Sequence, residues 1–110
     1  MANEKSKLPG TYRQFTERYP ELGAAHEQIA DAVAAAGPLD AKSRSLIKIG
    51  LAMGAGLESA VRSHVRQAMQ AGATEAEVEQ VALLAMNTLG FPRTVAAWSW
   101  VRQQVERGPD

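Results

Sequence analysis

The residues best suited to chemistry are a histidine and the basic side chains around it, between positions 44 and 66. His64 falls on an otherwise apolar helical face, where burial and a charged partner would tune its pKa for general acid or base catalysis. The alternative is a core histidine that donates a hydrogen bond to a backbone carbonyl. A carboxylate substrate would need a cation, and arginine binds carboxylates in a fork geometry. The candidate cations are Arg44, Lys48, Arg62 and Arg66, which could instead form a solvated face or salt bridges.

A second histidine, His26, shares a predicted inner face with Leu22, Ile29 and Val33. Two inward histidines could share a metal or relay a proton, but without carboxylates they are a weak metal signal, so we expect packing. The chain has no cysteine. This excludes disulfides, thiolate metal sites and thiol redox catalysis by the chain alone. We therefore predict neither a metal nor a cofactor.

The length and composition of the chain limit the classes of protein to which it can belong. A length of 110 residues indicates one domain with a modest core, which we place at 11–108 after a disordered segment at 1–10. Lys plus Arg and Asp plus Glu both number 12, so charge gives no case for nucleic acid or a membrane as partner. The N-terminus is charged with no apolar run behind it, and we expect a soluble cytoplasmic protein.

Helical spacing and local end signals predict an all-α fold of five or six helices, with no strand pattern. Asp40 is placed to cap one helix, and Thr74 with Glu77 forms a capping box at the start of another. Gly54 and Gly56 predict a break between two helices. The expected helices are 11–18, 21–36, 41–53, 57–71, 75–89 and 92–107.

Two stretches are apolar on every side, which is typical of helices buried all round. One is the second half of the helix at 41–53, and the other is VALLAM near the end of the helix at 75–89. A domain of this size can surround about one such helix. Trp100 adds apolar surface on a second face of the last helix, so we expect a homo-oligomer whose contacts cover the surplus. The predicted inner stripe of that last helix is Val95, Trp98, Val101, Arg102 and Val105.

Three motifs between residues 38 and 101 carry a resemblance to a known family. They are LDAKSRSLI at 39–47, SHVRQAMQAGAT at 63–74 and EVEQVALLAMNTLGFP at 77–92. With these motifs in this order, the chain resembles the carboxymuconolactone decarboxylase family, which includes the alkylhydroperoxidase D-like proteins. The resemblance implies an all-helical bundle of this type that assembles as trimers or hexamers, with a site at or near subunit contacts.

The peroxidase-type members of this family carry a glutamate, a C-x-x-C pair and a histidine four residues after the second cysteine. Laid on this chain by the histidine, these positions are Ser45, Leu57, Ala60 and His64. One thiol is needed to attack the peroxide and a second to resolve the product. The resemblance therefore implies no thiol peroxidase activity here.

The decarboxylase members act on a lactone that bears carboxylates, without cysteine, through a histidine and an acidic residue. By resemblance, His64 is the expected catalytic residue, which moves a proton, and Arg44 or Arg62 the expected substrate-binding cation, in a reaction without cofactor. Glu58 lies about 120° round the helix from His64, so an acidic partner would have to come from elsewhere, such as another subunit. Two functions stay open: an enzyme acting by proton transfer or decarboxylation on a small carboxylated lactone or acid, and a non-catalytic relative kept for binding or assembly.

Overall fold

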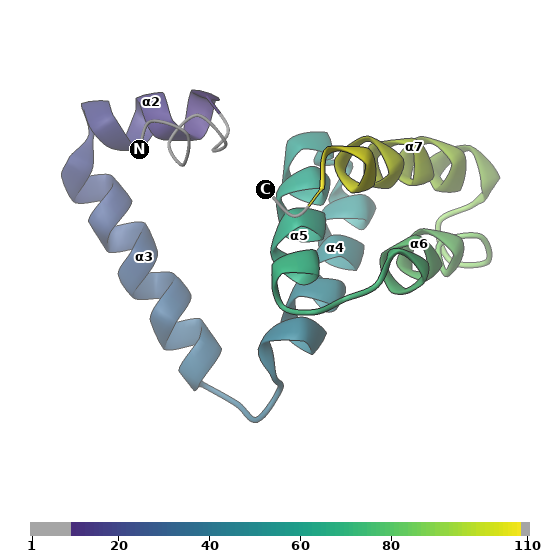
Figure 1. The fold of residues 1–110 in the computed structure, drawn as a ribbon, viewed down its shortest axis with the longest axis horizontal. Helices are drawn as coiled ribbons and strands as arrows, with labels where there is room; N and C mark the ends of the chain where they lie inside the picture. Colours follow the sequence, from purple (N-terminus) through teal and green to yellow (C-terminus); the bar gives the residue numbers. More distant parts are fainter. Residues whose placement is uncertain (1–9, 109–110) are drawn as a thin grey trace. The chain divides into compact units, whose positions relative to one another are not determined.

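A computed structural model describes residues 10–108, and within them every regular element is an α-helix (Figure 1). The chain divides into two compact units, here called unit 1 (residues 10–38) and unit 2 (residues 39–108). The all-α prediction is confirmed, with six helices in the described residues. None of these helices is long and apolar enough to cross a bilayer. The helices are α2 (Gly10–Arg18), α3 (Pro20–Ala35), α4 (Ala41–Ala55), α5 (Glu58–Gln70), α6 (Glu75–Leu83) and α7 (Phe91–Arg107).

Two predictions about the organisation of the chain are left untested. The disorder expected for residues 1–10 falls outside the described residues, apart from Gly10, which is the first residue of α2. The single domain expected over residues 11–108 remains a prediction, because the chain divides into two compact units that are described separately.

Unit 1 is a pair of helices with almost no interior. The helices α2 and α3 contact each other where Gly23 approaches Thr16: a Cβ on Gly23 would lie 3.1 Å from Thr16 Cγ2. Gly23 is the one buried residue in the described part of this unit. His26 and Ile29, predicted to point inward, are exposed instead. The reason is that within unit 1 the long helix α3 has only the short α2 to pack against.

In unit 2, α4 and α5 form a tight helical hairpin, as the glycines between them predict. Asp40 caps α4, because its carboxylate accepts the Ser43 N–H at 2.8 Å. Gly56 ends α4 in the left-handed conformation, with φ at 72°, which glycine adopts without strain. The Leu57 N–H then donates to the Ala52 carbonyl at 2.9 Å, so the chain reverses and α5 begins at once.

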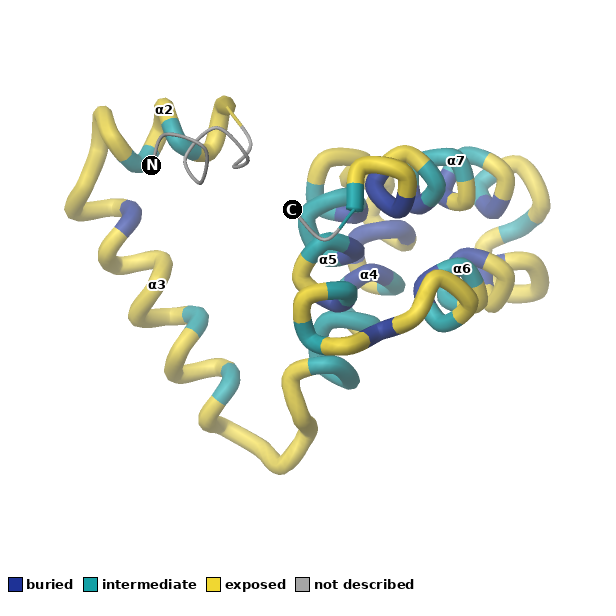
Figure 2. The backbone as a smooth tube through the Cα atoms, viewed as in Figure 1, coloured by how far each residue is buried: buried dark blue, intermediate teal, exposed yellow. Residues whose placement is uncertain are grey.

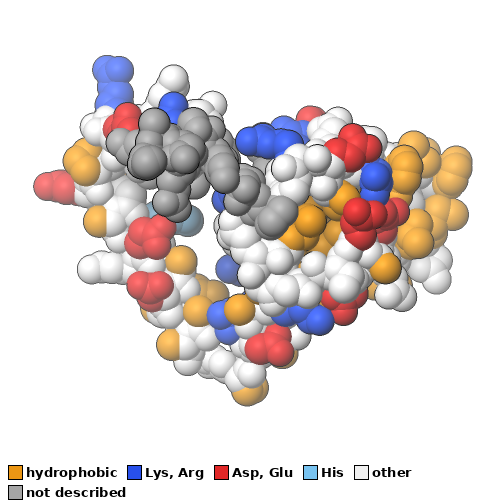
Figure 3. Space-filling view, in the orientation of Figure 1, with side chains coloured by type: hydrophobic (Ala, Val, Ile, Leu, Met, Phe, Trp, Pro, Cys, Tyr) orange, Lys and Arg blue, Asp and Glu red, His pale blue; other side chains and the backbone are white. Residues whose placement is uncertain are grey.

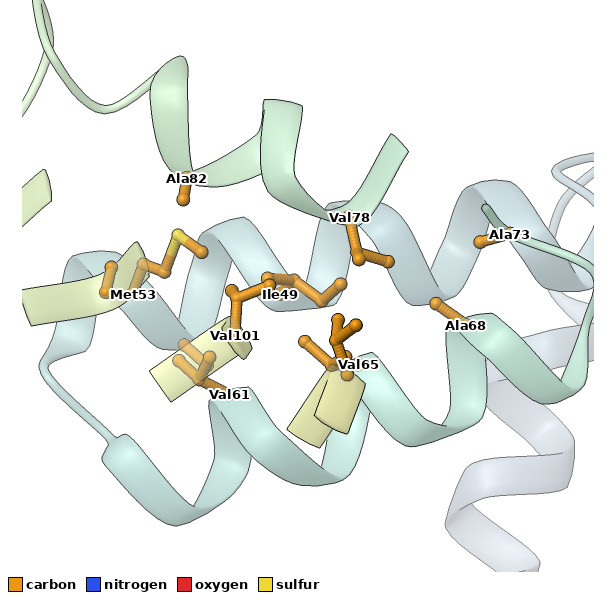
Figure 4. Packing of buried hydrophobic residues seen from close by; sticks show 12 residues of the cluster. Ile49, Met53, Val61, Val65, Ala68, Ala73, Val78, Ala82 and Val101 are labelled. Atoms are coloured by element: carbon orange, nitrogen blue, oxygen red, sulfur yellow. The ribbon is translucent and has the colours of Figure 1, made fainter. Parts of the chain in front are cut away.

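The core of unit 2 lies where α4, α5, α6 and α7 face one another (Figures 2 and 4). Burying one such side chain stabilises the fold by roughly 1.5–3 kcal/mol. Within this chain α4 is not covered on every side, since Ile47 is 50% exposed and Leu51 69% exposed, and its predicted burial by subunit contacts remains a prediction. The helices of unit 2 cover only one side of α4. The largest fully buried side chains are Ile49, Met53, Val61, Val65, Val78 and Val101.

The helix α6 begins where the sequence predicts and ends earlier. The Thr74 hydroxyl accepts the Glu77 N–H at 3.1 Å, and the Glu77 carboxylate accepts the Thr74 N–H at 2.9 Å, which confirms the capping box. Beyond Leu83, residues 84–89 form turns in which several N–H groups bond to carbonyls three residues back. These tighter bonds end the α-helix before the end predicted at position 89.

The inner face of α7 differs from the predicted stripe. Val95 and Trp98 lie outside the core, 49% and 42% exposed. The Trp98 indole N–H donates to Glu79 at 3.0 Å, and Arg102 donates to the same carboxyl group at 2.8 Å, so both amphipathic side chains take the rim. Trp100, predicted to point away from the core, packs against it. The residues that α7 buries are Thr94, Ala97, Val101, Gln104 and Val105, and the small ones among them let α7 pack closely.

Candidate functional site

His64 lies in the middle of α5, beside the buried stripe of this helix. The stripe consists of Val61, Val65 and Ala68. His64 follows Val61 by three positions and precedes Ala68 by four, so it neighbours both on the helix surface. It is half-buried, and α5 makes its main contacts with α4 and α7. His64 is therefore placed at the edge of the apolar face rather than at its centre.

One ring nitrogen of His64 is enclosed by protein. Nδ1 is buried and has no hydrogen-bond partner among the described residues. A proton on this nitrogen would be a buried donor without an acceptor, which costs about 1–3 kcal/mol. The neutral ring therefore favours the tautomer with its proton on Nε2. The alternative role, a donor from Nδ1 to a backbone carbonyl, is not what this geometry shows.

Burial is the main cause that lowers the pKa of His64, because an apolar environment disfavours the imidazolium. Lys48 of α4 and Arg66 of α5 lower the pKa further by charge repulsion, while a hydrogen bond with Gln67 opposes the shift. No carboxylate of the described residues is among the causes. His64 is therefore a neutral imidazole at neutral pH, next to positive charge.

Arg62, one of the two predicted substrate-binding arginines, is engaged on another side of α5. Its Nη1 lies 2.7 Å from Glu58 Oε2 and 3.1 Å from Gln103 Oε1 on α7. Arg62 precedes His64 by two positions, which places it about 200° away round the helix. The structure does not bring this arginine to His64, and its role remains a prediction.

Arg44, the other predicted arginine, lies in the first turn of α4. Its guanidinium donates a hydrogen bond to the Leu39 carbonyl. Lys48 follows Arg44 by one helical turn, so the two share a side of α4. Lys48 and Arg66 act on the pKa of His64, and Arg44 does not. Lys48 and Arg66 are thus the cations that influence the pKa of His64. Nothing in the sequence set them apart from Arg44 and Arg62.

Neither histidine has the surroundings of a metal ligand. His26 is exposed on α3, and His64 lies next to cations. Within residues 10–108, no three histidine, aspartate or glutamate side chains come together in a way that could hold a metal ion.

A hollow of about 590 Å³ lies between α4 and α6, away from the predicted site residues. Its volume is in the range of small-molecule pockets, and most of its wall is apolar. Sequence reasoning did not predict a hollow here. The feature of the sequence that could have indicated it is the apolar character of these two helices on every side. The wall includes Leu46, Ile47, Gly50, Met53, Val81, Leu84 and Leu89.

Comparison with known proteins identifies the family of this chain. The chain shares its fold with a carboxymuconolactone decarboxylase family protein from Legionella pneumophila, solved in its apo form. The two are 21% identical, with a TM-score of 0.73, over 91% of this chain and 88% of that one. No curated protein matches the chain. The family model for the carboxymuconolactone decarboxylase family matches residues 20–103, which is most of the chain. The chain therefore belongs to the carboxymuconolactone decarboxylase family, as a member without cysteine.

Proposed function

We propose that this protein is a cofactor-free enzyme of the decarboxylase type, which moves a proton on a small carboxylated lactone or related acid at His64. Family membership supports this substrate class. The observation that carries the proposal is a half-buried histidine that is held neutral beside two cations. A neutral imidazole can accept a proton at neutral pH, and its neighbours suit an anionic substrate.

Decarboxylation requires little more from the protein than a proton donor and positive charge near the substrate. When the bond to the carboxylate breaks, CO₂ leaves and the electron pair stays on the carbon or spreads into a neighbouring carbonyl. That position then takes a proton, which His64 delivers after accepting one from solvent or from another position of the substrate. Because Nδ1 is enclosed, this exchange has to pass through Nε2, which requires the less favoured tautomer with the proton on Nδ1, at a cost of about 1–3 kcal/mol.

Lys48 is the cation that we expect to meet the substrate carboxylate first. It repels the imidazolium form of His64 together with Arg66, and an anion bound beside them would relieve that repulsion. Arg44 and Arg62 remain predicted carboxylate ligands. Each would first have to give up the hydrogen bonds that it makes in the protomer.

The second candidate is that this protein is a non-catalytic member of the family that serves in binding or assembly. Two observations favour it: Nδ1 of His64 is enclosed without a partner, and none of the hollows described in residues 10–108 reaches His64. A general base needs its lone pair within reach of the substrate. In the favoured tautomer of His64, the free lone pair is the buried one on Nδ1.

Release of CO₂ from carboxymuconolactone by the purified protein tests the two candidates. If His64 moves the proton, His64→Ala lowers kcat by about 100-fold or more, the usual contribution of an acid–base group. Lys48→Met mainly raises KM, since it weakens carboxylate binding. His26→Ala is the matched control, because it removes the other histidine from an exposed position.

Each outcome of this assay decides between the candidates. Turnover that survives in His64→Ala contradicts the enzyme proposal at this site. A wild-type protein that folds but releases no CO₂ from this lactone or from related acids favours the non-catalytic relative.

A further inference from the structure

The hollow between α4 and α6 is an elongated site that the proposed chemistry does not use. Near the start of both helices, Lys42 pairs with Glu77 at 3.0 Å. Further along both, a Cβ on Gly50 would lie 3.9 Å from Val81 Cγ1. The two helices therefore run side by side in the same direction. The wall residues of α4 lie between positions 46 and 54, which is about 12 Å along the helix axis.

Large hydrophobic side chains of the wall lie partly in water. Exposed hydrophobic side chains gather over the end of unit 2 that carries the α6–α7 connection, to which Leu84 and Leu89 of the wall belong (Figure 3). On the α4 side, Ile47 is half exposed as well. Water in the hollow therefore meets a mostly apolar wall, and an apolar molecule that displaces this water is favoured.

Two glycines keep the α4 side of the hollow open. Gly50 and Gly54 are one helical turn apart, and both line the hollow. In a helix, glycine is less favourable than any other residue except proline. A Cβ on Gly50 would make an ordinary contact with Val81, and a Cβ on Gly54 would meet nothing within 4 Å. Helix packing therefore does not require glycine at these positions, whereas a large side chain there would occupy the hollow.

The polar groups of the wall disfavour a charged ligand. Among the described residues that line the hollow, none is lysine, arginine or histidine. A carboxylate bound there would lose its water without gaining a cation, and it would lie near the carboxylate of Glu77. An ammonium group would have to share Glu77 with Lys42, which already pairs with it. A neutral hydroxyl group has neither disadvantage.

A hydroxyl group finds hydrogen-bond partners at one end of the hollow. Glu77 and Gln80 lie one turn apart on α6, and both line the hollow. Glu77 Oε2 accepts a hydrogen bond from Lys42 Nζ and from no other described residue, and a carboxylate oxygen accepts about two. The Gln80 amide can both donate and accept. We propose that the hollow binds a neutral apolar molecule with one hydroxyl group, which meets Glu77 and Gln80, while the apolar body extends towards Leu84.

This site is independent of the proposed chemistry at His64. Gly50 lines the hollow, whereas Lys48, which acts on His64, lies about 200° away from Gly50 round α4. The ligand also differs from the proposed substrate, because it carries no carboxylate. The proposal therefore goes beyond the proposed function and does not rest on it.

Isothermal titration calorimetry of the full chain with octan-1-ol, octanoate and octylammonium tests the proposal. The three probes have alkyl chains of the same length and differ in the charge of the head group. We expect octan-1-ol to bind with a Kd below about 100 µM and a negative heat-capacity change. Octanoate and octylammonium should bind at least about 10-fold more weakly, because each brings a charge into the apolar hollow.

Variants of α4 show whether the probe occupies the hollow. Gly50→Leu fills the hollow and should weaken octan-1-ol binding at least about 10-fold. Ala55→Leu is the matched control, because it adds a leucine at an exposed position of α4 outside the hollow, and it should change the Kd by less than about two-fold. Circular dichroism checks that each variant is folded. If Gly50→Leu unfolds, Gly50→Ala is the second variant, which should raise Tm by about 4 °C and weaken binding about 3-fold.

Three results would overturn the proposal. One is a wild type that binds no octan-1-ol at concentrations up to roughly 1 mM, which would mean that the hollow is closed or covered in solution. Another is octanoate or octylammonium binding as tightly as octan-1-ol, since the wall would then not select a neutral head group. The third is an equal affinity for octan-1-ol in the Gly50 variant and in Ala55→Leu.

Discussion

The imidazole of His64 links the candidate site to the stability of the fold. In the folded protein its pKa is lowered, first by burial and then by Lys48, whereas the unfolded value is about 6.5. Between the lowered pKa and about 6.5, the unfolded state therefore binds more protons. The contribution of His64 to the free energy of unfolding is complete above this window and is lost as the pH falls through it. We expect the urea midpoint of the wild type to drop between about pH 7.5 and about pH 5.5, and that of His64→Gln to drop less.

The control for this prediction is His26→Gln, which removes the exposed histidine of α3 and should keep the full drop. The carboxyl groups of Asp40 and Glu77 also have lowered pKa values, chiefly through backbone N–H hydrogen bonds. Their contribution is lost only below about pH 4.5, outside the window. An equal drop in His64→Gln and in the wild type would show that His64 is not the titrating group.

The residues around His64 were only partly predictable from the sequence. Helical spacing alone places Arg62 on the side of α5 away from His64, and the structure agrees. Lys48 belongs to another helix, so its effect on His64 depends on how α4 packs against α5. That packing is a tertiary property, which spacing within one helix does not contain.

At the scale of elements, the capping box of α6 fixes where this helix begins. Thr74→Ala removes the acceptor of the Glu77 N–H and should lower the free energy of unfolding by about 1 kcal/mol. Thermal denaturation would show this as a fall in Tm of about 4–8 °C. Thr88→Ala is the control, because Thr88 is exposed and caps none of the described helices, and it should leave Tm nearly unchanged. Equal effects of the two substitutions would argue against the cap.

The starts of the helices were easier to predict than the faces they bury. Caps such as Asp40 and Thr74 act within a few residues, so the sequence carries them directly. The buried face of α7 depends instead on its partner helix, because Glu79 of α6 binds Trp98 and Arg102 and keeps both at the rim. An apolar stripe counted along one helix cannot include such a partner.

At the scale of the whole molecule, the buried side chains are distributed unevenly. Every member of the hydrophobic core cluster lies between Ile49 and Val105, whereas the described part of unit 1 buries only Gly23. The family model nevertheless spans residues 20–103 and so includes most of α3. The surplus of apolar residues that led us to expect an oligomer is found on the surface, as exposed side chains of α4 and of residues 83–91.

This distribution predicts how fragments of the chain behave. A fragment of residues 39–110 keeps the whole core cluster, so it should unfold cooperatively, with an m-value in keeping with its length. A peptide of residues 10–38 has two helices and no buried large side chain, so it should show partial helicity and no cooperative transition. Urea denaturation followed by circular dichroism compares both fragments with the full chain. Loss of cooperative unfolding in the longer fragment would mean that residues 10–38 are part of one folding domain, because the core cluster alone would then be too small to hold the fold.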